Sequence, residues 1–238
     1  MSVKQFFRKV FNFLHLDVTK NLEYDRLTKL VLKKVITSDS NCIDVGCHKG
    51  EILDEILKHA PNGKHLAFEP IPTFFEALKK NYQDKATIYP YALSDKKGTT
   101  TFHFVKNAPA YSGIKKRDYA VESPDIEKIQ VEIIPLDDLI PADYRPHFIK
   151  IDVEGGEFGV LKGAQKTLEK SKPVVLFECG LGASEHYGTT PEALHDYLAT
   201  LNYSIYLLKS FIGDSAALSR EDFIKLYKAN SEYYFVAK

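Results

Sequence analysis

The sequence predicts an α/β domain built on a mainly parallel β-sheet with helices on both faces. Segments typical of strands alternate with segments typical of helices along most of the 238 residues, and this alternation is characteristic of a parallel sheet. Two of the predicted strands, at 41–45 and 147–152, run into loops that combine acidic residues with glycines. Such loops lie at the carboxyl edge of an α/β sheet, where these folds bind their ligands.

The first forty residues are predicted to form a helical segment that packs on the main domain, which spans 41–238. From Val3 to Leu16, aromatic and aliphatic residues are interleaved with lysine and arginine, which predicts an amphipathic helix with a basic face. Such a helix can bind a membrane surface or a partner. Packing on the domain is the favoured interpretation, because surface helices usually face a core. A second helix is predicted over 24–35.

Beyond residue 40, apolar periodicity and turn residues separate the predicted elements. Residues 99–105 and 129–134 alternate in polarity, which predicts a β-hairpin that extends the sheet. The loop between them, Lys106–Lys128, is long for a compact domain, and we interpret it as a lid. The remaining predicted elements are strands at 41–45, 65–68, 86–91, 147–152, 174–178, 203–208 and 233–237, and helices at 50–59, 72–81, 158–170, 191–201 and 220–229.

Composition excludes several classes of protein. The chain has 32 basic and 32 acidic side chains, so no overall field attracts nucleic acid or an acidic membrane. Its three cysteines include no C-x-x-C pair, which argues against a disulfide framework and favours a reducing compartment. The sequence has no apolar run long enough to span a bilayer and no signal-peptide pattern. We therefore expect a cytoplasmic protein with no transmembrane segment; the oligomeric state stays open.

The first acidic loop follows the strand at 41–45. Asp44 ends the strand, Gly46 permits a tight turn, and Gly50 stands at a helix start, where unpaired N–H groups favour a carboxylate or a phosphate. The dinucleotide fingerprint G-x-G-x-x-G is absent. A P-loop is also absent, because Glu51 follows Gly50 instead of lysine. The loop therefore argues against NAD and ATP.

The next two strands also end in polar groups. Glu69 follows the strand at 65–68, where a carboxylate can accept both hydroxyls of a ribose. Taken alone, Glu69 is equally well explained as a solvated acid or as a helix-capping partner just before Pro72. The third strand ends in Ala92-Leu93-Ser94-Asp95, which offers apolar atoms and polar groups to an adenine. Taken alone, the residues from Ser94 form an ordinary turn.

Taken in order, these blocks resemble the FkbM family of S-adenosylmethionine-dependent methyltransferases. The resemblance runs from about Asn41 to Lys238, and the block after Phe148 is its most specific part. Cys47 departs from the alanine usual in the family, but it is small. The blocks are Asp44-Val45-Gly46-Cys47-His48-Lys49-Gly50, Phe68-Glu69-Pro70, Ala92-Leu93-Ser94-Asp95, Leu136-Asp137-Asp138-Leu139, Lys150-Ile151-Asp152-Val153-Glu154-Gly155-Gly156-Glu157 and Val160-Leu161-Lys162-Gly163-Ala164.

The resemblance implies a Rossmann-like methyltransferase fold of about seven strands, with an inserted β-hairpin and lid loop. It also implies O-methylation of a sugar, glycan or polyketide-like hydroxyl with S-adenosylmethionine as cofactor. Glu69 would hold the ribose, and Asp152 would lie near the transferring methyl. The residues implied at the cofactor are Asp44, Gly46, His48, Gly50, Glu69, Pro70, Ala92, Leu93, Ser94, Asp95 and Asp152.

Three residues are candidates for the base that removes the acceptor proton. Asp152 and Glu154 are two residues apart, so on a continuing strand their side chains point the same way. Two carboxylates that share a site raise the pKa of one of the pair. The alternative is that Asp152 orients the cofactor amine and Glu154 caps a turn. His48 is the third candidate, with holding the cofactor loop as its alternative role. Lys150 is interpreted as snorkelling at the strand edge.

The acceptor is predicted to be a small molecule or saccharide, not a nucleic acid. Tyr111 and Ser112 of the long loop, with Glu178, are predicted to bind it. Basic residues at 115–117 would suit an acidic acceptor, and a solvated charged loop is the equally weighted alternative. Two other functions compete: a metal-dependent hydrolase using Asp152, Glu154 and Glu178, and a non-catalytic S-adenosylmethionine-binding module. No metal site is predicted, and a metal held near Asp152 within a methyltransferase stays open as an alternative.

Overall fold

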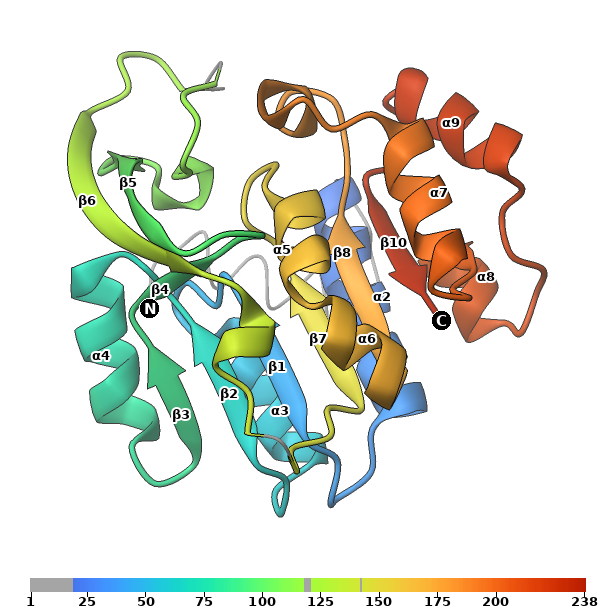
Figure 1. Cartoon of the computed structure of the whole chain (residues 1–238), viewed down its shortest axis with the longest axis horizontal. Coiled ribbons are helices and arrows are strands. Elements are labelled where there is room, and N and C mark those ends of the chain that lie inside the picture. Colours follow the sequence, from blue (N-terminus) through green and yellow to red (C-terminus); the bar gives the residue numbers. More distant parts are fainter. Residues whose placement is uncertain (1–18, 118–120, 142) are drawn as a thin grey trace.

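The computed structural model describes residues 19–117, 121–141 and 143–238, and its main β-sheet has seven strands (Figure 1). These strands are β1 (Cys42–Val45), β2 (His65–Phe68), β3 (Ala86–Tyr89), β7 (Phe148–Ile151), β8 (Val174–Glu178), β9 (Ile205–Leu207) and β10 (Tyr234–Ala237). Their order is β3-β2-β1-β7-β8-β10-β9; the first five are parallel, and β10 is antiparallel to both neighbours. The predicted α/β class with a mostly parallel sheet is confirmed. The helix predicted over Val3–Leu16 lies outside the described residues.

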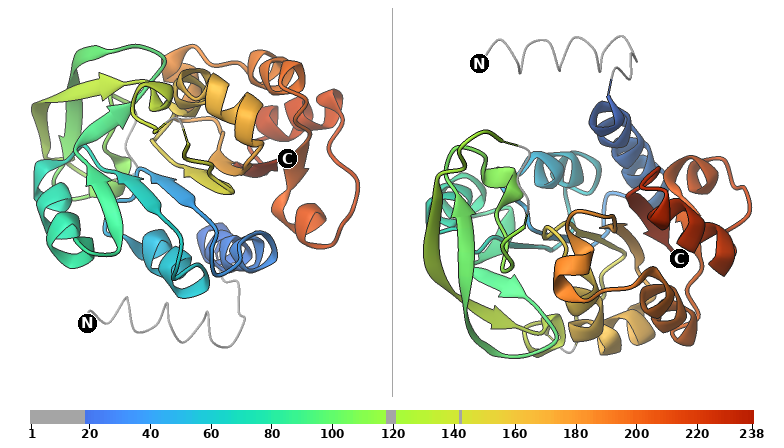
Figure 2. Two further views of the ribbon diagram at one scale, coloured as in Figure 1. Left: turned by 60° about the horizontal axis from the view of Figure 1, so that its bottom comes forward. Right: turned by 90° about the horizontal axis from the view of Figure 1, so that it is seen from above.

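Helices cover both faces of this sheet (Figure 2). One face carries α2 (Lys20–Val35), α3 (Glu51–His59), α4 (Pro72–Tyr82) and α8 (Leu208–Ile212). The other carries α5 (Glu157–Gly163), α6 (Gln165–Ser171), α7 (Pro191–Thr200) and α9 (Arg220–Lys228). Strands buried on both faces are apolar throughout. In β1, the exception is Asp44, an acid with no exposed surface.

The helix α2 begins four residues before the start predicted from the sequence. Thr19 caps it, since its hydroxyl oxygen accepts a hydrogen bond from the Leu22 N–H at 3.3 Å. Tyr24, Val31 and other residues of one side are buried against the sheet and against α3 and α8. The amino-terminal end of α2 therefore lies close to the carboxyl edge of the parallel strands, beside the start of β10.

The predicted hairpin forms, but it does not extend the main sheet. β5 (Gly98–Val105) and β6 (Ile126–Ile134) pair antiparallel, and β6 also pairs with β4 (Tyr91–Leu93) in a separate three-stranded sheet. The strand predicted over 86–91 is divided by Pro90, which has no N–H to donate to a ladder. The chain therefore leaves the main sheet at Tyr89 and enters the second one at Tyr91.

Two further boundaries differ from the prediction. The helix predicted over 158–170 is divided at Ala164 into α5 and α6. Asp137 stabilises the new start, because its carboxylate accepts hydrogen bonds from the N–H groups of Lys166 and Thr167. The strand predicted over 203–208 is reduced to β9, because α8 begins at Leu208. Among the described residues, no helix is long and apolar enough to cross a membrane.

Candidate active site

One large cavity, of about 1750 Å³, lies at the carboxyl edge of the parallel strands. It lies where the sheet order reverses, since β1 is flanked by β2 on one side and by β7 on the other. Most of the residues predicted at the site line it. They are Gly46, His48, Glu69, Pro70, Ala92, Leu93, Ser94, Asp95, Tyr111, Ser112, Asp152, Glu154 and Glu178.

Two predicted residues lie behind the cavity wall. Gly50 caps α3 in a left-handed conformation and packs against the ring of Tyr82. Asp44 is fully buried, and its Oδ1 lies 3.5 Å from the Nζ of Lys150. Both residues shape the loop between β1 and α3 from beneath and do not face the cavity.

Gly46 brings the ends of β1 and β7 into close contact. Its φ is +74°, and a Cβ atom at this position would lie 2.0 Å from the carbonyl oxygen of Asp152. The N–H groups of Gly46 and Cys47 both donate to the carbonyl oxygen of Phe68, at 3.0 and 3.1 Å. The glycine thus serves both turn geometry and the close approach of two backbone segments.

We expect Gly46→Ala to destabilise the protein more than Gly182→Ala. Both positions have left-handed backbone, which costs an alanine roughly 1–2 kcal/mol. A Cβ at Gly182 meets no atom within 4 Å, whereas a Cβ at Gly46 meets backbone. Denaturant unfolding should show an additional loss of at least about 2 kcal/mol at Gly46. Equal losses would show that the contact with Asp152 relaxes freely.

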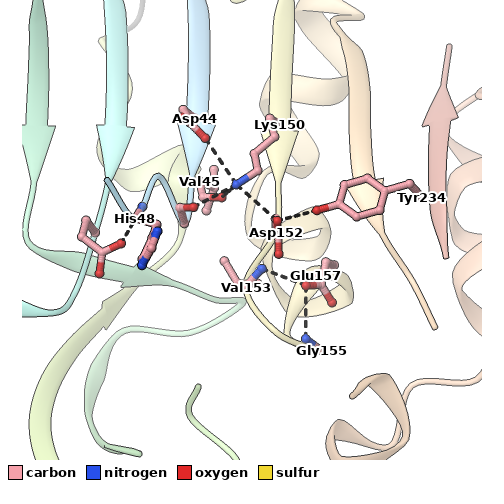
Figure 3. Close-up of polar contacts among 11 residues, drawn as sticks. Asp44, Val45, His48, Lys150, Asp152, Val153, Gly155, Glu157 and Tyr234 are labelled. Carbon is pink, nitrogen blue, oxygen red and sulfur yellow. Dashed lines mark hydrogen bonds and ion pairs between the residues drawn. The ribbon is translucent and has the colours of Figure 1, made fainter. Parts of the chain in front are cut away.

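Lys150 connects the two acidic loops (Figure 3). Its ammonium donates to the carbonyl oxygen of Gly46 at 2.8 Å and lies 3.5 Å from Asp44 and 3.6 Å from Asp152. Burial alone lowers the pKa of Lys150, but the two carboxylates raise it above its ordinary value. The residue is only 6% exposed, so the snorkelling interpretation is wrong. Lys150 is a buried cation.

Glu69 is buried, and its carboxylate joins the first two loops. One oxygen accepts from the N–H of His48 at 2.8 Å, and the other accepts from the N–H of Ile71 at 2.9 Å. Burial raises its pKa to about 7, although these two hydrogen bonds oppose the rise. An ionised carboxylate has about four acceptor sites. The observed bonds match the capping alternative and leave acceptor capacity for a ligand.

Three carboxylates meet beyond Lys150. Asp152, Glu154 and Glu178 each offer an oxygen, and these atoms lie within 4.8 Å of one another. The predicted reason for the pairing of Asp152 and Glu154 is wrong, because β7 ends at Ile151 and Glu154 has a left-handed φ of +60°. A turn brings the two acids together.

The three acids differ in protonation. Burial opposes ionisation of Asp152, but Lys150 and hydrogen bonds from Tyr234 and Glu178 hold its pKa below the ordinary value. Burial and the Asp152 charge raise the pKa of Glu178 well above its ordinary value. For Glu154, burial and Asp152 raise the pKa to about 8, even though the Arg117 guanidinium is paired with it. The cluster therefore combines one acid whose ionisation is favoured with two whose ionisation is opposed by burial and by the Asp152 charge.

His48 lies on the other side of Lys150 from Tyr234 (Figure 3). Its ring packs edge-on against Phe74, with centroids 4.7 Å apart. Burial lowers its pKa, so the imidazole is neutral near pH 7. Its Nε2 is buried without a hydrogen-bond partner among the described residues. Of the three predicted bases, His48 is the one separate from the acidic cluster.

The long loop contributes fewer free groups than the sequence indicates. The Ser112 hydroxyl accepts from the N–H of Val105 at 3.0 Å, which fixes the loop to β5. Arg117 stacks over the Tyr111 ring, 5.0 Å from its centroid, and pairs with Glu154. The Lys115 N–H donates to the hydroxyl of Tyr187 at 3.2 Å. Arg117 is therefore committed to a carboxylate of this chain.

Sequence reasoning missed two residues of the site. Lys150 gave a usable signal, because a lysine between the buried Ile149 and Ile151 must be buried or lie at an edge. Tyr234 gave none: its hydroxyl donates to Asp152 at 2.5 Å, but only the antiparallel pairing of β10 with β8 brings it there.

Comparison with known proteins gives matches to methyltransferases. A family model described as the methyltransferase FkbM domain matches residues 44–205. The chain is 23% identical to the 2-O-methyltransferase NoeI of Sinorhizobium fredii (strain NBRC 101917 / NGR234) over 169 residues, covering 65% of this chain and 68% of that protein. The crystal structure of methyltransferase FkbM from Methylobacillus flagellatus KT aligns with a TM-score of 0.53 at 18% identity, covering 85% of this chain and 44% of that one.

These matches establish two points. This chain spans less than half the length of the solved M. flagellatus chain, so that likeness bears on the fold, which is Rossmann-like in both. The family model matches more than half of the 238 residues. The chain therefore belongs to the FkbM methyltransferase domain family.

Proposed function

We propose that this protein is an S-adenosylmethionine-dependent O-methyltransferase that acts on a hydroxyl of a sugar, glycan or polyketide-like small molecule. The observation that carries the proposal is the single cavity that brings Gly46, Glu69 and the stretch 92–95 to one side of Asp152. The similarity to a 2-O-methyltransferase supports oxygen as the methylated atom. S-adenosylmethionine supplies an electrophilic methyl group.

The residues of the cavity suit such a cofactor. The close approach of Gly46 to Asp152 leaves no room for a side chain, which is what a backbone-lined cradle needs. Glu69 retains acceptor capacity for ribose hydroxyls, and Ala92 and Leu93 offer an apolar surface beside Ser94 and Asp95. The chemistry of these groups matches a nucleoside bearing an amino-acid tail.

The protein's task in the reaction is alignment and proton removal. S-adenosylmethionine held by the cavity would supply the methyl group to the acceptor oxygen, and a base of this chain would take the hydroxyl proton. Glu154, with its pKa raised to about 8, is our proposed base, and the ionised Asp152 orients the reactants. Lys150 and Tyr234 position Asp152.

Calorimetry tests the cofactor assignment. We expect S-adenosylmethionine to bind, and ATP and NAD not to bind, with or without Mg²⁺. An absolute requirement for Mg²⁺ that disappears in Asp152→Asn would favour the three acids as metal ligands. Binding of ATP or NAD in place of S-adenosylmethionine would reject the proposal.

Glu69→Ala should weaken S-adenosylmethionine binding at least about tenfold. The change removes two hydrogen bonds to a charged group, each worth roughly 1.5–3 kcal/mol. Glu76→Ala, an exposed acid on the neighbouring α4, is the matched control and should have no effect. An unchanged dissociation constant in Glu69→Ala would remove Glu69 from the ribose site.

The same site predicts a pH dependence of cofactor binding. Ribose hydroxyls donate to the ionised carboxylate, and the pKa of Glu69 is about 7 without ligand. Affinity should therefore rise about tenfold from about pH 6 to pH 8, as Glu69 loses its proton. Glu69→Gln should flatten this profile. A profile of the same slope in Glu69→Gln would assign the titration to another group.

A further inference from the structure

The cavity continues past Asp152, on the side away from Glu69. In the sheet, β8 and β10 follow β7 on that side. Figure 2, seen from above, shows the three-stranded sheet and the pair of α2 and β10 at opposite sides of the molecule. We name this part of the cavity the α2–β10 lobe; it is lined by Asn21, Tyr24, Thr28, Glu178, Tyr233 and Tyr234.

Interactions across the lobe hold its walls in a fixed arrangement. The Tyr233 hydroxyl donates to the Asn21 Oδ1 at 2.6 Å, and the Tyr24 and Tyr233 rings meet edge to face with centroids 4.7 Å apart. Tyr24 is also bonded to Glu232, and the Tyr233 N–H donates to the Tyr24 hydroxyl at 3.3 Å. The walls of the lobe are therefore aromatic and preorganised.

The direction of methyl transfer favours this lobe for the acceptor. The proposed ribose and adenine contacts come from the ends of β2 and β4, on one side of Asp152. A displacement at the methyl carbon requires the incoming oxygen opposite to the leaving sulfur. The α2–β10 lobe is opposite to those contacts.

The side chains of the lobe indicate the chemistry of its ligand. Tyrosines combine an apolar ring face with a polar tip, which suits the alternating C–H and O–H groups of a sugar ring. The lobe receives cavity-lining residues from three segments of the described chain: 19–28, β8 and 233–234. The charged residues among them are Asp25 and Glu178, and none is basic. The nearby ammonium of Lys20, 5.7 Å from the centroid of the Tyr24 ring, is paired with Glu232, so an anionic acceptor would meet acids there without an unpaired cation.

We propose that the α2–β10 lobe binds the methyl acceptor and that the acceptor group seated in it is an uncharged sugar ring. This inference rests on the proposed function, since it places the acceptor relative to the proposed cofactor site. It assigns specificity for the acceptor to Asn21, which precedes β1 in the chain, and to Tyr233, which follows β8. Both residues lie outside the long loop.

Binding of simple glycosides to the complex with S-adenosylhomocysteine tests the inference. Calorimetry first measures S-adenosylhomocysteine binding; failure at this step would reject the proposed function and not the lobe. Saturation-transfer NMR then measures the binding of methyl β-D-glucoside, methyl β-D-galactoside and the matching glucuronide to this complex. We expect at least one neutral glycoside to bind, and the glucuronide at least about tenfold more weakly. A wild-type complex that binds no neutral glycoside would overturn the proposal.

Variants locate the binding. Asn21→Leu, at an exposed position, and Tyr233→Ala should each weaken glycoside binding about tenfold or more, with S-adenosylhomocysteine affinity unchanged. Tyr233→Phe, which keeps the ring and removes the hydroxyl, replaces Tyr233→Ala in this test if that variant does not fold. Thr100→Val, on the opposite wall, is the control. Loss of binding in Tyr111→Ala, with retention in both lobe variants, would place the acceptor under the long loop and overturn the proposal.

Discussion

Lys150→Met is expected to lower the free energy of unfolding by about 3–5 kcal/mol, the usual result of removing one partner from a buried ion pair. The ammonium of Lys150 lies between Asp44 and Asp152 and also donates to the Gly46 carbonyl. Methionine fills a similar volume but leaves Asp44, which has no exposed surface, without its cation. Denaturant unfolding at constant pH measures the loss.

Lys162→Met is the matched control. Lys162 and Asp95 are 2.7 Å apart, but both side chains are well exposed, at 41% and 38%. Exposed pairs contribute about 0–1 kcal/mol, so this variant should be nearly as stable as the wild type. The double variant Lys150→Met, Asp44→Asn should regain part of the lost stability, because the second change removes the unpaired buried charge. Equal losses in the two lysine variants would show that Lys150 is not a structural cation.

The loss in Lys150→Met should increase with pH. Burial already raises the pKa of Asp44, and removing the nearby cation raises it further. A group whose pKa is higher in the folded state binds its proton there more tightly, so stability falls as pH rises above the unfolded value. The difference between variant and wild type should therefore be larger at about pH 8 than at about pH 5.

The parts of this protein that follow from local sequence were predictable. Strand β1 with its Asp44, the turn at Gly46 and the start of α3 occupy ten consecutive residues, and each local preference agrees with the others. Glu69 follows β2 in the same way. Long-range pairing was not predictable: whether residues 91–93 join the first sheet or a second one depends on β6, some forty positions further along the chain.

In the candidate site, too, local features were predictable and long-range contacts were not. The sequence predicted Asp152 and Glu154 near the reacting centre, and both line the cavity. Their electrostatic roles depend on partners that local sequence does not identify. Tyr234 reaches Asp152 from β10, and Arg117 reaches Glu154 from the loop between β5 and β6. Because a pKa depends on all charges within a few ångströms, assignment of the base required the fold.

Asp152 and Glu154 should respond differently to loss of charge. Asp152→Asn replaces the anionic acceptor of the Tyr234 hydrogen bond by a neutral amide and removes one ionic partner of Lys150, so we expect weaker S-adenosylmethionine binding that added acceptor does not restore. Glu154→Gln should leave cofactor affinity unchanged, because Glu154 makes its ion pair with the loop residue Arg117. Calorimetry on the two variants makes this comparison.

Glu154→Gln is expected to lower turnover by about a hundredfold, within the usual range for loss of a general base. In the wild type, turnover should rise with pH and level off above about pH 8, as Glu154 loses its proton. Arg117→Met removes a nearby cation, raises the pKa of Glu154 and should move this midpoint to higher pH.

The measurement is methyl transfer from labelled S-adenosylmethionine to an acceptor found by screening glycosides and hydroxylated natural products. The residual rate of Glu154→Gln should keep climbing with pH, since the acceptor then ionises without help. Near-normal turnover in both Glu154→Gln and Asp152→Asn would transfer the role of base to His48, whose neutral imidazole also lines the cavity.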